Sequence, residues 1–169
     1  MRIRPYIPEL DFGAVSSWIT DELTHALWCA NRFGFPLTQD NFAAVLSEHA
    51  ISCGDCPFVA TTDSGETIGF FCLSVNTETN AAMLKFVVLS PDVRGKGCGR
   101  EMIELAVRYA FELAGADTVR LCVFDVNSAA RRCYTVAGFT EVSADENAFT
   151  YNGETWGRCH MEVKRDGKK

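Results

Sequence analysis

The stretch VVLSPDVRGKGCGR, residues 87–100, decides the fold because it joins a strand, a glycine-rich loop and the start of a helix. Its apolar start, Val87 to Leu89, favours a buried strand that ends before Pro91. The glycines of RGKGCGR allow backbone conformations closed to other residues, and the amphipathic run from Met102 to Leu113 predicts a helix. A loop at the positive end of a helix dipole is typical of a phosphate or pyrophosphate site.

Three cations strengthen this prediction. Arg94, Lys96 and Arg100 lie within one short loop of a chain whose formal net charge is −6. Each charge-assisted hydrogen bond to a phosphate contributes roughly 1.5–3 kcal/mol. The triphosphate P-loop needs GxxxxGK followed by Ser or Thr, and the dinucleotide pattern GxGxxG would need a glycine at Arg100 or Met102. Both patterns are excluded, and a tight turn remains the alternative interpretation of the glycines.

A second segment, residues 119–139, has the sequence VRLCVFDVNSAARRCYTVAGF. Val119 to Val126 predict a strand, Asn127 or Ser128 supplies a helix N-cap, and Gly138 ends the helix. Tyr134 follows Asn127 by nearly two helical turns, so the two side chains share one face with a rise of roughly 10 Å. Taken singly, Asn127 is most simply a cap and Tyr134 a core aromatic. Together with the first loop, they indicate one extended ligand site.

These two segments resemble the coenzyme A site of the GNAT (Gcn5-related N-acetyltransferase) superfamily. The first carries the RxxGxG pattern of Arg94, Gly97 and Gly99, and the second carries the order strand, Asn, two-turn helix, Tyr and Gly-Phe. The resemblance covers nearly the whole chain. It implies one domain of the α/β (α+β) class over residues 1–169, with a mixed, mostly antiparallel central sheet flanked by helices.

The resemblance also assigns roles to residues. Acetyl-coenzyme A (acetyl-CoA) would be the donor substrate, and no metal is implied. Asn127 would hold the amide-bearing arm of the coenzyme, while Tyr134 would be the catalytic acid that protonates the departing thiolate, which suits a phenol with an ordinary pKa of about 10. The implied coenzyme-binding residues are Val87, Val88, Leu89, Arg94, Gly95, Lys96, Gly97, Cys98, Gly99, Arg100 and Asn127.

The reaction implied by the resemblance is transfer of an acetyl group from acetyl-CoA to a primary amine of a small molecule or peptide, by direct attack of the amine. Two alternatives stay open. One is a coenzyme A-binding regulatory module without catalysis, and the other is an acyltransferase that uses a longer acyl-CoA. The presence of Tyr134 favours catalysis over the regulatory module.

The proton acceptor for the amine is not identified by the sequence. An amine with a pKa of about 10.4 is only about one part in 10³ neutral at pH 7, so a group must take its proton. In the ribosomal-protein alanine acetyltransferase branch, a Glu five residues before the Asn does so; this chain has Cys122 there, which we expect to be a buried, neutral thiol. Ordered water is one alternative. The other candidates are Asp125, Glu78, Glu141, Glu154, His25, His49 and His160.

Composition narrows the class of protein further. A length of 169 residues and 47% hydrophobic content suit one domain with a sufficient core. The isoelectric point near 5.1 argues against nucleic acid and favours cationic amines as partners.

The absence of a long apolar run argues against export and a membrane span, so we expect a cytoplasmic protein with reduced cysteines. Cys53 and Cys56 form a CxxC without a suitable second ligand pair, so no metal is expected. A homodimer is one assembly open to such a protein.

The remaining pattern predicts alternating strands and helices. The segment from Trp18 to Phe35 is rich in aromatic residues and corresponds to the acceptor-binding region of the family, although core packing is the simpler interpretation. We expect strands over residues 1–7, 57–62, 67–75, 82–89, 119–126, 139–142 and 154–163, and helices over 11–20, 38–50, 97–113 and from 127 to about 137.

Overall fold

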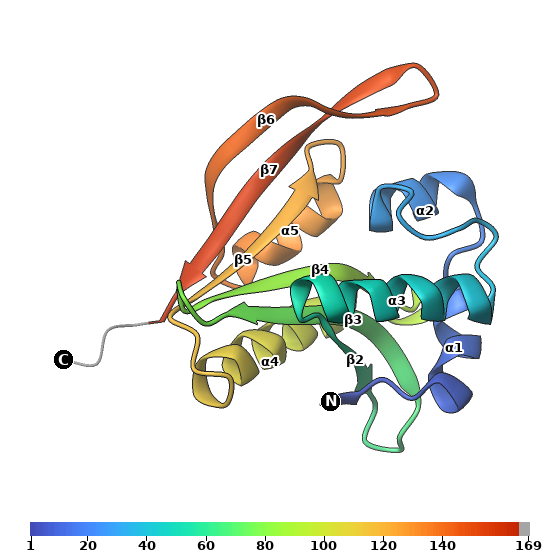
Figure 1. Cartoon of the computed structure of the whole chain (residues 1–169), viewed down its shortest axis with the longest axis horizontal. Coiled ribbons are helices and arrows are strands. Elements are labelled where there is room, and N and C mark those ends of the chain that lie inside the picture. Colours follow the sequence, from blue (N-terminus) through green and yellow to red (C-terminus); the bar gives the residue numbers. More distant parts are fainter. Residues whose placement is uncertain (166–169) are drawn as a thin grey trace.

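A central sheet with helices on both faces forms the fold of this chain. The computed structural model describes residues 1–165; residues 166–169, the end of the predicted domain, lie outside the described residues. The seven strands within that part follow the order β1-β2-β3-β4-β5-β7-β6, and every neighbouring pair is antiparallel except β4 and β5 (Figure 1). The predicted mixed, mostly antiparallel sheet is therefore confirmed.

The strands are β1 (Arg2–Pro5), β2 (Cys56–Thr61), β3 (Thr67–Asn76), β4 (Ala81–Leu89), β5 (Thr118–Phe124), β6 (Thr140–Tyr151) and β7 (Glu154–Lys164). The helices are α1 (Pro8–Ser17), α2 (Glu22–Cys29), α3 (Gln39–Cys53), α4 (Cys98–Glu112) and α5 (Ser128–Val136), with a short 3-10 turn, η1 (Pro91–Val93).

Two hydrophobic clusters cover the two faces of the sheet. Helices α4 and α5 pack on one face, where Met102, Ile103 and Tyr134 join buried residues of β3, β4 and β5. Helices α1, α2 and α3 cover the other face, around Phe42 and Phe70 (Figure 1). The β6–β7 hairpin extends beyond these layers, so much of its surface stays exposed.

Three elements differ from the sequence-based expectation, and the first is α1, which spans Pro8–Ser17 instead of residues 11–20. Helix α2 was not predicted, although Asp21 caps it by accepting a hydrogen bond from the Thr24 N–H at 2.8 Å. Strand β6 continues to Tyr151 instead of ending at residue 142. Almost all of β6 is exposed on both faces, so it lacks the apolar alternation by which a strand is recognised. Asn152 and Gly153, which both have positive φ, form the turn that joins β6 to β7.

Strands β4 and β5 part at one end and form a fork. Their parallel pairing begins at Ala81 and Thr118 and stops at Leu84 and Leu121, yet both strands continue beyond that point. Beyond the last pair, β4 carries a bulge at Phe86, whose φ is 51°. The fork therefore leaves the facing edges of the two strands without a strand partner, and both ends lead to the predicted site.

No helix within residues 1–165 is long and apolar enough to cross a membrane.

Candidate active site

The loop between β4 and α4 presents a row of unpaired backbone N–H groups. The φ angles of Gly95 and Gly97 are 73° and 84°, which only glycine adopts readily. Gly97 is the N-cap of α4 and offers no side chain to the helix end. Within the described residues, no acceptor outside α4 is found for the N–H groups of residues 95–100. Consecutive free N–H groups at a helix N-terminus make an anion-binding concavity.

The three predicted cations of this loop have different surroundings. Arg94 turns back onto the end of β4, where its Nε and Nη2 donate to the Leu89 carbonyl at 3.1 and 3.0 Å. Arg100 pairs with Glu104 through a contact of 2.6 Å. Lys96 has no ion pair within residues 1–165 and is exposed. Of the three loop cations, Lys96 is therefore the most available to bind a phosphate, while Arg94 holds the loop against the end of β4.

Helix α5 lies against the start of α4 and brings Asn127 to the same end of the sheet. A Cβ at Gly99 would lie 3.3 Å from Cys133 Sγ, so glycine permits this close approach. Asn127 is the N-cap of α5, as predicted, and its Oδ1 accepts from the Ala130 N–H at 3.2 Å. Its amide N–H₂ has no partner in the described part of the chain and can donate to a ligand carbonyl.

Tyr134 lies in the core cluster beneath α4 and α5, and its side chain is 7% exposed. No hydrogen-bond partner of its hydroxyl is found among the described residues, yet none of their fully buried side-chain N or O atoms lacks a partner. The hydroxyl therefore keeps a small accessible surface. Burial raises the pKa of Tyr134 above its ordinary value, with a smaller effect from Cys133. The phenol remains protonated at neutral pH and can donate a proton.

The structure corrects the expectation for Cys122, which is exposed instead of buried. Its neighbours on β5 face the core under α5, so Cys122 faces the opposite side of the sheet. Its Sγ lies 3.3 Å from His160 Nδ1, and His160 Nε2 lies 2.7 Å from Asp145 Oδ2. Loss of hydration against the neighbouring strands raises the pKa of the Cys122 thiol, although Arg158 opposes this effect.

No sequence pattern favoured His160 over the other histidines, and none identified Asp145. His160 lies opposite Cys122 because β7 pairs with β5. Asp145 reaches His160 because β7 also pairs with β6. The alternation of Cys159 and Met161 with His160 along β7 is the one local signal, because it places His160 on the face away from the core. The register itself has no local signature.

The other carboxylates considered as proton acceptors are exposed, namely Asp125, Glu78, Glu141 and Glu154. Glu141 is held by Arg131 at 3.0 Å. No contact connects any of them with Cys122 in the described residues.

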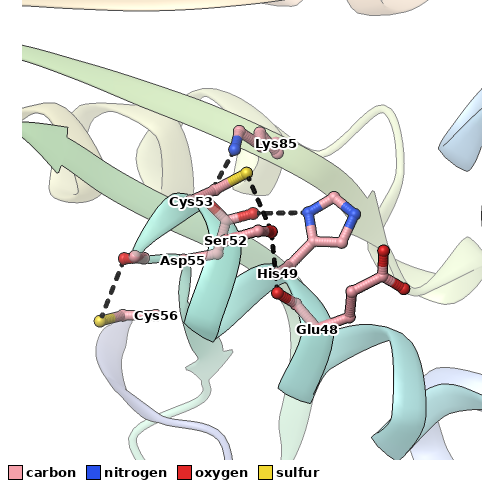
Figure 2. Close-up of polar contacts among 8 residues, drawn as sticks. Glu48, His49, Ser52, Cys53, Asp55, Cys56 and Lys85 are labelled. Atoms are coloured by element: carbon pink, nitrogen blue, oxygen red, sulfur yellow. Dashed lines mark hydrogen bonds and ion pairs between the residues drawn. The ribbon is translucent and has the colours of Figure 1, made fainter.

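A buried charge cluster supports the fork from the α3 side (Figure 2). Asp55 is 3% exposed; its Oδ1 lies 2.7 Å from Lys85 Nζ and its Oδ2 lies 3.0 Å from His49 Nδ1. Burial opposes ionisation of Asp55, but the hydrogen bonds from Lys85 and His49 outweigh it and hold the pKa of Asp55 below its usual range. Lys85 directly follows Leu84, the last residue of β4 that pairs with β5, so the cluster fixes this strand where the fork opens.

The CxxC pair lies beside this cluster (Figure 2). Cys53 Sγ is 3.4 Å from Ser52 Oγ, and Cys56 Sγ is 3.8 Å from the Gly54 carbonyl. Within residues 1–165, no three His, Cys, Asp or Glu side chains come together in a way that could hold a metal ion.

The aromatic segment around α2 packs mainly into the core, as the simpler interpretation predicts. Trp18 and Phe33 are buried, and Trp28 stacks on Phe33 with ring centroids 4.9 Å apart. Trp28 also donates from Nε1 to the Phe86 carbonyl at 2.8 Å, which holds the bulge of β4. Phe35 differs, because 39% of it is exposed.

One family model matches more than half of this chain. The family model described as the acetyltransferase (GNAT) family matches residues 20–139. The chain belongs to this family. The resemblance seen in the sequence is therefore confirmed, and GNAT enzymes use acetyl-CoA.

One curated relative is similar to part of this GNAT chain. The mycothiol acetyltransferase of Propionibacterium freudenreichii subsp. shermanii is 33% identical over 89 residues. The match spans 52% of this chain but only 28% of that protein.

Solved structures agree in fold with this GNAT chain. A spermidine N-acetyltransferase from Vibrio cholerae, in complex with CoA and spermine, superposes with a TM-score of 0.81 at 21% identity, over 96% of this chain and 94% of that one. A chimera of that enzyme and hSSAT superposes with a TM-score of 0.79 at 21% identity, with the same coverage. At this identity, the comparison establishes the fold.

Proposed function

We propose that this protein is an acetyl-CoA-dependent N-acetyltransferase that acts on a primary amine by direct attack. The observation that carries the proposal is the fork between β4 and β5: β4 continues from it into the loop of unpaired N–H groups at residues 95–100, and β5 continues from it to Asn127 at the start of α5. The pyrophosphate of the donor fits the loop, where the N–H groups, the helix dipole and Lys96 favour negative charge. The amide-bearing arm fits the open strand edge, with the Asn127 amide as a donor.

The proposed chemistry needs one acid and one proton acceptor. The amine nitrogen attacks the thioester carbon, the C–N bond forms, and the bond between that carbon and the coenzyme sulfur then breaks. Tyr134 supplies the proton that the departing thiolate takes up, which its raised pKa and remaining accessibility support. A cationic amine loses two protons overall, one before it can attack and one after the C–N bond has formed, because the product amide is neutral.

The acceptor in this proposal is a cationic amine. A hollow of about 290 Å³ beside the β6–β7 hairpin is lined in part by the carboxylates Asp125, Asp145 and Glu146. The net charge of −6 also favours positively charged partners over nucleic acid. Both properties suit a polyamine or another small amine more than an anionic substrate. The Vibrio cholerae structure contains spermine, which makes polyamines the first class to test.

The test is a panel of acceptors incubated with acetyl-CoA. Spermidine, spermine, an aminoglycoside, free amino acids and short peptides with free N-termini should be compared by release of free thiol, with mass spectrometry of the product. We expect thiol release with at least one amine, together with a product carrying one acetyl group. Spermidine with its amines blocked serves as the control. A chain that binds acetyl-CoA but acetylates none of these amines would favour the regulatory module instead.

A further inference from the structure

We propose that Cys122, His160 and Asp145 form a proton relay that takes the proton from the attacking amine. The inference rests on the proposed acetyltransferase function and names the proton acceptor that this function requires. In this relay Cys122 contacts the amine, while His160 receives the proton through Cys122 and Asp145 positions His160.

The hydrogen-bond geometry suits one tautomer of His160. Asp145 Oδ2 lies 2.7 Å from His160 Nε2, so the carboxylate accepts a hydrogen bond from a protonated Nε2. The neutral ring then has no proton on Nδ1, which faces Cys122 Sγ at 3.3 Å and can accept the thiol proton. A nucleophile or acid beside a base that a third group orients is a recurrent catalytic arrangement. His160 and Asp145 are partly exposed, with side chains 34% and 57% accessible, so the site is open to an acceptor.

Cys122 stands at the apex of the fork. It follows Leu121, the last residue of β5 that pairs with β4. The edge of β4 from the apex to the loop, Lys85 to Leu89, spans ~13 Å at ~3.3 Å per residue. A coenzyme with its pyrophosphate at the loop and its arm along this edge therefore carries its thioester towards Cys122.

The two proton-transfer groups lie on opposite faces of the sheet. Tyr134 belongs to the cluster under α4 and α5, and Cys122 faces the other side. This separation lets the amine reach the carbonyl carbon from one side of the sheet while the thiolate is protonated from the other. Each departing or arriving proton then has its own partner, and the two groups do not compete.

Each proton transferred in the proposed reaction has a donor and an acceptor. The amine nitrogen forms the C–N bond only as the neutral amine, and it gives its remaining excess proton to water once the bond has formed. Before that attack, one proton of the ammonium passes to Cys122 Sγ while the Cys122 proton passes to His160 Nδ1. The resulting imidazolium is stabilised by Asp145, and His160 later returns its proton to solvent. Cys122 ends the cycle as a thiol, so no acetyl group is ever attached to it. Tyr134 gives its proton to the coenzyme thiolate and recovers one from water.

Several charged groups surround the relay. On the neighbouring strands, Arg158 and Asp145 act on Cys122 in opposite directions. Along β7, Glu162 is paired with Arg120 on β5 at 3.5 Å. On β4, Lys85 is held by Asp55 and directs its charge towards α3. His160 is therefore the base in direct contact with the thiol among the described residues.

Kinetics across pH tests the relay with the best amine of the panel. We expect Cys122→Ala and His160→Gln each to lower kcat about 30-fold at pH 7, below the 10²–10⁴ of a fully lost base because water can enter the space. The loss should shrink towards pH 10, where more of the amine is already neutral. Cys53→Ala, an exposed cysteine on α3, is the matched control and should retain wild-type kinetics. Affinity for coenzyme A should not change in any variant.

Two further variants separate a relay from a structural hydrogen bond. Cys122→Glu accepts a proton without His160, so we expect it to be active and insensitive to an added His160→Gln change. In the absence of donor, His160→Gln should slow alkylation of Cys122 by iodoacetamide about tenfold, while the exposed Cys53 and Cys56 react as before.

Three results would overturn the proton relay, and only the third would also remove the proposed acetyltransferase function. Equal kcat of Cys122→Ala and wild type from pH 6 to 10 would overturn the relay and leave the acetyltransferase intact. An acetyl group found on Cys122 by peptide mass spectrometry after mixing with acetyl-CoA alone would also overturn it, in favour of a covalent route. A wild-type protein that neither binds acetyl-CoA nor acetylates any amine would remove the proposed function, and the relay with it.

Discussion

Replacement of Tyr134 by Phe should lower kcat about 10²-fold or more while coenzyme A affinity stays within about twofold, because a general acid contributes about 10²–10⁴. The hydroxyl is the only group removed, and no protein partner of it is found among the described residues. The fold should therefore lose little stability. The measurement is steady-state kinetics together with calorimetric titration of coenzyme A.

Tyr109→Phe provides the matched control for this change. Tyr109 is a half-buried tyrosine of α4 that packs against Phe58 with ring centroids 5.0 Å apart, away from the fork. Loss of the Tyr109 hydroxyl should leave kcat unchanged. Wild-type turnover should also show no decline from loss of the Tyr134 proton up to about pH 10, the ordinary pKa of tyrosine, because burial raises the pKa of Tyr134. Full turnover of Tyr134→Phe at several pH values would remove this residue from the mechanism.

Asp11→Ala should cost about 3–5 kcal/mol of folding free energy, since it leaves a buried ion pair without its anion. Asp11 is fully buried in α1, where its carboxylate accepts from Arg4 at 2.7 and 2.8 Å, from Thr67 at 2.6 Å and from the Ile7 N–H at 2.8 Å. These bonds tie α1 to β1 and β3. We expect the melting temperature to fall by about 6–20 °C, measured by calorimetry. Glu48→Ala, at an exposed position of α3, should change it little.

The same carboxylate predicts the acid response of the fold. Burial opposes ionisation of Asp11, but the bonds from Arg4, Thr67 and Ile7 outweigh it and hold its pKa below the ordinary 3.8. A group with a lowered folded-state pKa stabilises the fold above its unfolded pKa and loses that contribution as the pH falls through the folded value. Wild-type stability should thus decline below about pH 4, and Asp11→Ala should show a shallower decline. An equally steep decline in the variant would assign the acid response to other carboxylates.

The sequence predicted the half of the site that local patterns encode. A strand ending before proline, a run of alternating glycines and the Asn127–Tyr134 spacing are all local, and each prediction of local structure was confirmed. The N-cap role of Asn127 and the core position of Tyr134, each given as the simpler interpretation, both hold in the structure. Neither excludes a second role, because no hydrogen-bond partner of the Asn127 amide N–H₂ or of the Tyr134 hydroxyl is found within residues 1–165.

The other half depends on contacts that no local pattern records. Cys122 was expected to be buried because its segment is apolar, but the neighbouring sheet face carries no helix at this position. His160 reaches it through the pairing of β5 with β7, and Asp145 reaches His160 through β6. Strand β6 itself was cut short at residue 142 because its exposed polar residues follow no period. The prediction therefore lacked the pairing register of strands that lie far apart in the sequence.

Thermal unfolding in the presence of acetyl-CoA tests the central claim, that the fork and its loop form a donor site, most directly. A ligand that binds only the native state stabilises it by RT ln(1 + [L]/Kd), about 2.7 kcal/mol at 100 times Kd, which corresponds to about 5–11 °C. We expect a shift of this size for wild type and a smaller one for Lys96→Glu, which reverses the charge of the loop cation without a partner in residues 1–165. No shift of the wild-type melting temperature at high excess of acetyl-CoA would contradict the account.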